Sequence, residues 1–312
     1  MLRHRHRVLT RPELDDEPLH RTITMTRPVR QMHGLGAERG AAAWEPVAVL
    51  LHETGADWDR RAHRVSVLAR TLSASLVDTW ATRRPEDQDA LTVRAYFHAV
   101  RATNPAAVRY AVTECEEAAS ADPDDPTPWT ALLSLIRRNR MSPSFAWPVW
   151  DEVVKRDPWN RTAHYEMLRC LSPGTSGSPA FEMKDFADQR AAVSPLGSPL
   201  AVLPLAARAE HYAHRLATVG RDAPVLSGHW YGRVVTRETD TALEGWFHTT
   251  ARPHAQAVAD LNILAFALTM TQRAGEAEAV FRRLGRQMTP FPWNTIADPL
   301  GTFMFWAARA RR

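Results

Sequence analysis

His211 and His214 lie three residues apart, and His211 directly follows Glu210. This spacing could place metal-binding side chains on one face of a helix. Zinc in proteins takes three or four ligands in a tetrahedral arrangement, and the spacing specifies no third ligand here. The chain also lacks the His-Glu-x-x-His pattern of zinc-dependent proteases. We therefore interpret the two histidines as ordinary solvated side chains, and expect neither a metal nor another cofactor.

The two cysteines, Cys115 and Cys170, are the next candidates for chemistry. A nucleophilic cysteine needs an electropositive environment that lowers its pKa. Cys115 is instead flanked by Glu114, Glu116 and Glu117, whose charges would raise the pKa of its thiol. Two cysteines are also too few for a disulfide framework. The sequence thus predicts two buried free thiols in a reducing cytoplasm.

Two glycine-containing stretches approach known catalytic or nucleotide-binding turns but have the wrong spacing. In Gly34-Leu-Gly36-Ala-Glu-Arg-Gly40 there is one residue too many between the second and third glycines, and no series of parallel strands follows. In Gly174-Thr-Ser176-Gly177 the serine lacks the residue that a nucleophile elbow places before its second glycine. Both are interpreted as loops. With no catalytic motif, the sequence predicts a protein that is not an enzyme.

The amino-acid composition further limits the class of protein. The 312 residues are 45% hydrophobic and 24% charged, which is ordinary for a folded chain. No apolar run approaches 18 residues and no apolar segment follows the basic N-terminus, so we expect neither a membrane span nor a secretory signal. The pI is about 9.4 and the bases are almost all arginine. Because acids and bases are interspersed, we attribute this bias to a GC-rich bacterial genome, and nucleic-acid binding is not favoured.

The elements that position these residues are helices. Asp122-Pro123 and Asp157-Pro158 are near-identical junctions 35 residues apart, and two helix-length segments with a short break lie between them. This spacing is typical of helix-pair repeats of the 34-residue class. Earlier in the chain, Asp57 is the expected N-cap of a long helix and Asn104-Pro105 is expected to start another.

The apolar positions of these segments resemble the tetratricopeptide-repeat pattern, in which large and small apolar residues mark two successive helices with a proline after the second. The resemblance is good over residues 261–290, fair over 126–158 and partial over 159–195, and it departs from the pattern at Leu133 and Leu168, which replace the small residue of the first helix. The residues that carry it are Trp129, Leu132, Leu133, Ile136, Phe145, Val149, Val153, His164, Met167, Leu168, Leu171, Leu261, Leu264, Ala265, Leu268, Ala277, Phe281, Leu284 and Pro290. It implies an all-α fold, a superhelical stack of antiparallel helix pairs.

We expect two regions. Residues 1–41 read as a poorly ordered tail with at most an isolated strand at Ile23 and Met25, and Met25 is an alternative start of translation. Residues 42–312 form the helical-repeat domain, interrupted by insertions near 173–179 and 218–236. The aromatic segment 303–306 and the arginines after it are interpreted as a capping helix rather than a membrane-surface helix. Four tryptophans are expected to pack in the core: Trp129, Trp147, Trp150 and Trp159.

In the repeat class that the sequence resembles, first-helix residues just after the packing positions face a concave groove. That implication places six residues there: Thr130, Ser134, Arg137, Tyr165, Arg169 and Asn262. Arginines in a groove suit a carboxylate-bearing peptide, because the planar guanidinium binds carboxylate in a bidentate manner. We therefore expect a cytoplasmic adaptor that holds a protein or an acidic peptide through Arg137, Tyr165 and Arg169. An enzyme or enzyme-accessory protein on a helical scaffold and an arginine-dependent nucleic-acid-linked regulator remain open alternatives.

Overall fold

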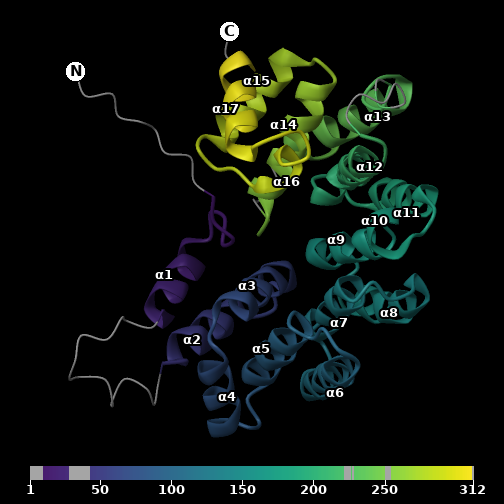
Figure 1. Cartoon of the computed structure of the whole chain (residues 1–312). Coiled ribbons are helices and arrows are strands. Elements are labelled where there is room, and N and C mark those ends of the chain that lie inside the picture. Colours follow the sequence, from purple (N-terminus) through teal and green to yellow (C-terminus); the bar gives the residue numbers. More distant parts are fainter. Residues whose placement is uncertain (1–9, 28–42, 221–225, 227, 250–253, 311–312) are drawn as a thin grey trace, which may run out of the picture. The chain divides into compact units, whose positions relative to one another are not determined.

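A computed structural model of the chain describes residues 10–27, 43–220, 226, 228–249 and 254–310 (Figure 1). Within these residues the regular structure is helical and contains no strand, so the predicted all-α class is confirmed. No helix in the described part of the chain is long and apolar enough to cross a membrane. The chain divides into two compact units. The first unit is Asp16–Cys170, and the second begins at Leu171 and includes the described residues before Asp16.

The first unit contains nine α-helices among its described residues. They are α1 (Glu17–Thr26), α2 (Glu45–Thr54), α3 (Trp58–Thr71), α4 (Ala74–Arg83), α5 (Gln88–Ala99), α6 (Pro105–Ala121), α7 (Thr127–Arg138), α8 (Ala146–Arg156) and α9 (Arg161–Cys170). Several begin at side chains that accept a hydrogen bond from an unpaired backbone N–H of the first turn. Asp57 accepts from Arg60 N at the start of α3, and Asn104 accepts from Ala107 N at the start of α6, which confirms both expected helix starts.

The order of packing in this unit centres on α3. Helices α3, α5, α7 and α9 pack against one another in succession, and α3 also contacts α7 and α9. Asn160, just before α9, donates to the carbonyl of Trp58 at the start of α3, at a distance of 3.5 Å. At the other end of α3, Arg101 donates to the carbonyl of Ala69 from just after α5. Helix α3 therefore runs in the same direction as α5 and α9.

Helix α1 corrects the prediction of a poorly ordered tail over residues 1–41. Residues 17–26 form a helix, because Asp16 caps its first turn by accepting from Leu19 N and because Leu19 and Ile23, one turn apart, are buried. The strand expected at Ile23 is therefore wrong. Residues 1–9 and 28–42, which include Gly34 to Gly40, lie outside the described residues.

The second unit is also helical. Its α-helices are α10 (Pro173–Ser176), α11 (Ala180–Val193), α12 (Leu203–Val219), α13 (Arg233–Ala242), α14 (Ala257–Met270), α15 (Ala274–Leu284), α16 (Pro290–Trp293) and α17 (Pro299–Ala310). Edge-to-face and tilted rings form a core between α14, α15, α16 and α17, with centroids 5.3–5.9 Å apart. Its members are Phe266, Phe281, Trp293 and Phe303.

Both expected insertions contain helix. Residues 173–176 form α10 instead of a loop, and its end is fixed by Gly177 in a left-handed conformation. Residues 218 and 219 complete α12, and α13 begins at Arg233. Residues 221–225 and 227 of the second insertion lie outside the described residues.

The turns after α7 and α14 have the same geometry, with one non-glycine residue in the left-handed region. Arg140 has φ 52° and Gln272 has φ 61°. In each turn the next amide donates to a carbonyl five residues back, from Met141 to Ile136 at 3.0 Å and from Arg273 to Leu268 at 2.9 Å. Helices α7 and α14 therefore end in turns with the same backbone conformation and the same hydrogen-bond pattern.

Replacing Arg140 with glycine is expected to raise the free energy of unfolding of the first unit by about 0.5–1 kcal/mol, because glycine adopts positive φ without the clash of a Cβ atom. Urea denaturation would measure the change. Arg140→Ala removes the same side chain but keeps the Cβ atom, so it should give no gain. A glycine variant no more stable than the alanine variant would contradict the strain account.

Candidate functional site

Five arginines gather at the carboxyl-terminal ends of α3, α5, α7 and α9. Because these helices pack in succession, residues far apart in the sequence lie at one end of the unit. Basic side chains are favoured there by the negative end of the helix dipole, which accounts for part of the pattern. We call this set the arginine cluster; its members are Arg70, Arg101, Arg137, Arg138 and Arg169.

The guanidinium groups of Arg137, Arg70 and Arg101 are anchored at the helix ends. Nε of Arg137 donates to Oε2 of Glu166 at 2.5 Å. Arg70 donates from Nη1 to the carbonyl of Ser66 at 2.7 Å, and Arg101 lies over the ring of Phe97, 3.5 Å from its centroid. These contacts orient the side chains while leaving Arg70 and Arg101 exposed.

The charged groups of the arginine cluster lie close enough to shift one another's pKa values. Burial by itself would raise the pKa of Glu166, but Arg137, Arg169 and Arg70 outweigh it and hold that pKa below its usual range. Burial lowers the pKa of the Arg101 guanidinium, and the like charges of Arg138 and Arg70 lower it further. The guanidinium groups outnumber the Glu166 carboxylate, so the cluster carries a net positive charge.

The structure brings together two of the three predicted binding residues. Arg137 and Arg169 are half-buried members of the cluster, both electrostatically coupled to Glu166. Tyr165 is only 6% exposed, and its ring lies under the guanidinium of Arg161, 3.7 Å from the centroid. Its side chain therefore offers little surface to a partner.

Three further residues expected in an open groove are in fact buried. Thr130 and Ser134 on α7 have no exposed surface, and α7 is packed among α3, α5 and α9. Asn262 is also fully buried, and its Oδ1 accepts from Nε1 of Trp293 at 2.8 Å. The groove-lining prediction is wrong for these residues, because the first helices are buried on nearly all sides.

The core prediction for the four tryptophans is correct for Trp150, which is buried, and for Trp129, which is partly buried against the core. It is wrong for Trp147 and Trp159, which are 43% and 39% exposed. In the second unit, Phe303 of the expected capping helix is buried, whereas Phe305 of the same segment is 60% exposed.

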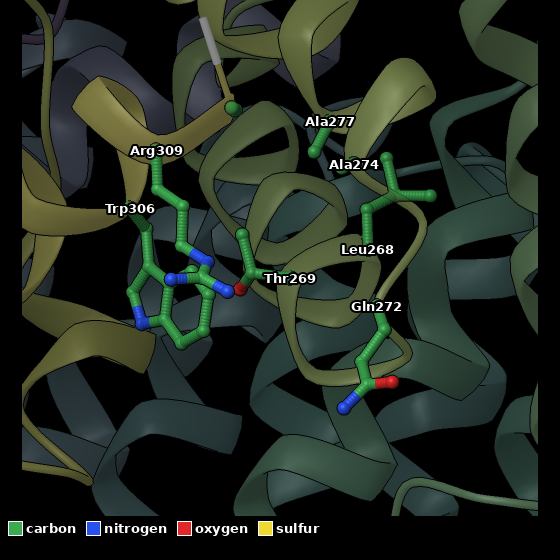
Figure 2. Close-up of a pocket in the computed structure, with 8 residues that line it drawn as sticks. Leu268, Thr269, Gln272, Ala274, Ala277, Trp306 and Arg309 are labelled. Carbon is green, nitrogen blue, oxygen red and sulfur yellow. The ribbon is translucent and has the colours of Figure 1, made fainter. Parts of the chain in front are cut away.

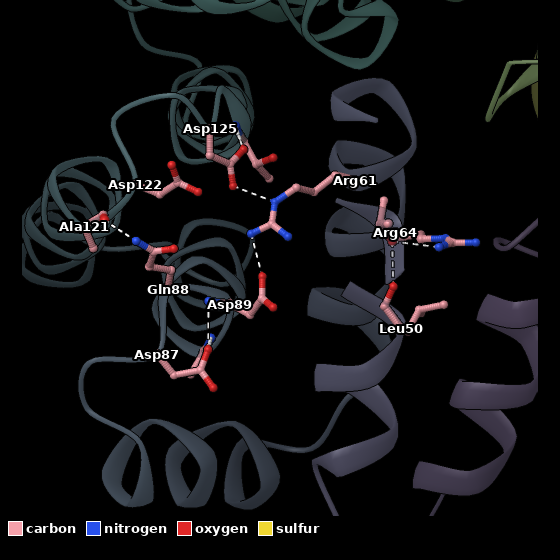
Figure 3. A network of polar contacts seen from close by, with 12 residues as sticks. Leu50, Arg61, Arg64, Asp87, Gln88, Asp89, Ala121, Asp122 and Asp125 are labelled. Atoms are coloured by element: carbon pink, nitrogen blue, oxygen red, sulfur yellow. Dashed lines mark hydrogen bonds and ion pairs between the residues drawn. The ribbon is translucent and has the colours of Figure 1, made fainter. Parts of the chain in front are cut away.

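The opposite ends of the same helices carry acids (Figure 3). Arg61 of α3 lies between Asp89, near the start of α5, and Asp125, just before α7, with N–O distances of 2.7 Å to both carboxylates. Burial raises the pKa of Asp89 in spite of Arg61. Asp125 is fully buried and also accepts from Thr127 N. Helix α7 therefore runs in the same direction as α3 and α5, and Arg61 fastens the three helix starts together.

The remaining sequence candidates show no catalytic arrangement. Both cysteines are buried; burial raises the pKa of Cys115, and raises that of Cys170 to about 12. Thiols with such pKa values are protonated at neutral pH and are poor nucleophiles. Within the described residues no group of three potential ligands could hold a metal ion, and this includes the surroundings of His211 and His214.

His229 makes the second unit sensitive to acid. Burial lowers its pKa to about 4, and the nearby Arg208, His211 and Arg215 also disfavour its charge, although its Nε2 hydrogen-bonds the Arg208 carbonyl at 3.0 Å. The unfolded chain protonates this ring at a pKa of about 6.5. Stability is therefore fully present above that pH and is lost as the pH falls toward about 4.

His229→Gln is expected to reduce the fall in thermal midpoint between about pH 7 and about pH 4.5, because it removes the group that titrates in this window. Circular dichroism melts at a series of pH values would measure it. His248→Gln replaces an exposed histidine of the same unit and should leave the profile as in the wild type. Identical profiles for the His229 variant and the wild type would contradict the assignment.

Neither a protein-family model nor a curated protein matches the chain. The arginine cluster combines exposed and half-buried like charges with helix ends that hold them in place.

Proposed function

We propose that the protein is a non-catalytic scaffold that binds an acidic segment of a protein or peptide at the arginine cluster. The observation that carries the proposal is the set of five neighbouring guanidinium groups with one carboxylate: Arg70, Arg137 and Arg169 act on Glu166, and Arg70 and Arg138 act on Arg101. Such an excess of like charge costs free energy unless an anion neutralises it, so it favours a carboxylate-rich partner.

The chemistry of arginine supports this choice of partner. A guanidinium has five N–H donors in a planar fork, and the backbone contacts of Arg70 and Arg101 use only part of that set. The remaining donors suit the two oxygens of a carboxylate. Because Arg70, Arg101 and Arg138 are exposed, a partner can reach them without rearranging the helices.

As the finer architecture we propose a superhelical stack of antiparallel helix pairs, similar to tetratricopeptide repeats. Two observations support it. Helices α3, α5, α7 and α9 pack in succession while α6 and α8 pack against α5 and α7. In addition, the α7–α8 and α14–α15 turns share one geometry. In this arrangement α3 occupies the inner side of its unit, so the partner binds at the helix ends instead of along the groove.

The proposal places the protein in the cytoplasm, where an adaptor would meet other proteins. The enzyme alternative has less support, because the buried thiols have raised pKa values. The nucleic-acid alternative shares the same positive charge, and a binding experiment has to distinguish it.

The experiment is fluorescence anisotropy with a short labelled peptide of alternating Glu and Gly, titrated with the intact protein. We expect saturable binding that weakens as salt is added, because the contacts are ionic. A Lys-Gly peptide of equal length should not bind. Absence of binding to the Glu-Gly peptide at low salt would overturn the proposal, and tighter binding of a single-stranded oligonucleotide of equal charge would favour the nucleic-acid alternative instead.

A further inference from the structure

The second unit contains a cavity of about 270 Å³ between α14, α15 and α17 (Figure 2). Figure 2 shows the side chains of Trp306 and Arg309 projecting from α17 on one side, with Leu268, Gln272 and Ala277 on the other. Its lining residues are Leu268, Thr269, Gln272, Ala274, Ala277, Trp306, Arg309 and Ala310.

The cavity follows from a change in side-chain size along α17. At the amino-terminal half of that helix, Phe303 fills the space against Phe281 and Trp293, with ring centroids 5.6 Å away in both cases. One turn further along, the facing residues of α15 are only Ala274 and Ala277. Their methyl groups cannot fill the space that the larger rings fill beside Phe303, so a void remains.

The lining has one charged group and one large aromatic surface. The guanidinium carbon of Arg309 lies 6.0 Å from the ring centroid of Trp306, and Arg309 is exposed, so it stands at the opening. Thr269 is buried and donates its hydroxyl hydrogen to the carbonyl of Phe266 at 2.7 Å. Carboxylate side chains are absent from the lining residues, so a bound anion would meet Arg309 without a competing acid.

We propose that this cavity binds a small aromatic carboxylate. The ring would pack on Trp306 and Ala274, the lining side chains with open apolar surface, and the carboxylate would accept from the Arg309 guanidinium at the opening. The cavity volume of about 270 Å³ lies just below the range of about 300–1,000 Å³ that is common for ligand pockets. It therefore suits one ring with a short acidic side chain rather than a nucleotide. The site lies in the second unit and is independent of the peptide-binding proposal, which concerns the first.

The test uses phenylacetate as the probe, with isothermal titration calorimetry on the full chain. Phenylacetate is expected to bind, whereas benzylamine, which has a similar ring and the opposite charge, is not. Arg309→Ala should weaken phenylacetate binding at least about ten-fold, which is the loss of one charge-assisted hydrogen bond. Ala274→Leu, at an exposed position of the lining, should abolish binding by filling the cavity, and ligand-detected NMR with the same variant would report the loss independently of heat.

Arg282→Ala is the matched control, because Arg282 is a solvent-exposed arginine of the same unit that pairs with Glu278 away from the cavity. It should leave the phenylacetate affinity unchanged. Thermal melts of each variant confirm that it is folded before titration. Failure of phenylacetate to bind the wild type, equal binding of benzylamine, or unchanged binding to folded Arg309→Ala and Ala274→Leu variants would each overturn the proposal.

Discussion

Asp16→Asn is expected to lower the free energy of unfolding of the first unit by about 3–5 kcal/mol, because it leaves the Arg64 guanidinium buried without its counter-charge. The carboxylate of Asp16 binds Arg64 through two hydrogen bonds, Nε to Oδ2 at 2.8 Å and Nη2 to Oδ1 at 2.9 Å. The two side chains are only 1% and 8% exposed, respectively. Thr54, which also accepts a hydrogen bond from Arg64, is a neutral hydroxyl and cannot replace the lost charge.

Urea denaturation of the full chain, followed by circular dichroism, measures this change. Glu17→Gln is the matched control, because Glu17 is an exposed acid next to Asp16 and its loss should cost little. The double variant Asp16→Asn with Arg64→Met should recover part of the stability, since it removes the orphaned charge. A loss below about 1 kcal/mol for Asp16→Asn would contradict the account, as would a double variant less stable than Asp16→Asn alone.

The ion pair of Asp16 and Arg64 also predicts how the stability of the first unit changes with pH. Burial alone would raise the pKa of Asp16, but its bonds to Arg64 and the Leu19 amide lower it below the usual range. The stabilisation is therefore present above the unfolded pKa of about 3.9 and is lost as the pH falls through the lower folded value. Asp16→Asn should correspondingly reduce the acid sensitivity of the first unit.

The helical class followed from the sequence because its signals are local. Asp57 and Asn104 cap helices by bonds that span three residues, and an apolar repeat spans two turns, so both are visible in a short window. Helix α1 was missed because its apolar face is short. Only Leu19 and Ile23 on it are buried apolar residues, and the ion pair that holds it joins residues 48 positions apart.

The arginine cluster was only partly predictable, because part of it depends on contacts between residues far apart in the sequence. Arg137 and Arg169 were grouped because one repeat spacing relates their helices. Arg70 and Arg101 join them only because α3 packs beside α5, α7 and α9, and that packing is a long-range property. Arg70, Arg138 and Arg169 each lie in the last turn of a helix, but only the packing of those helices shows that the three turns meet. Tyr165 was misjudged because the helix that carries it is buried on nearly all sides.

Neutralising the exposed part of the arginine cluster is expected to weaken the Glu-Gly peptide about 100-fold at low salt. The variant is Arg70→Gln with Arg101→Gln and Arg138→Gln. Three charge contacts of about 1 kcal/mol each account for the loss. Arg137 and Arg169 are retained because they accompany the buried Glu166, and removing them would disturb the fold. The salt dependence of the remaining binding should also become shallower, because fewer ionic contacts are left.

The matched control carries the same change in net charge outside the cluster: Arg21→Gln, Arg83→Gln and Arg109→Gln, all at exposed positions of the first unit. It separates a local site from the general attraction of a basic protein. Thermal melts should show both triple variants to be folded, with a somewhat lower midpoint for the cluster variant, because Arg101 also donates to the carbonyl of Ala69.

The anisotropy titration of these two triple variants against the Glu-Gly peptide tests the binding proposal most directly. The account predicts that the cluster variant loses about two orders of magnitude in affinity while the control variant stays within about three-fold of the wild type. Equal losses in both variants, or full affinity in the cluster variant, would show that the peptide responds to net charge or binds elsewhere, and would contradict the assignment of the arginine cluster as the binding site.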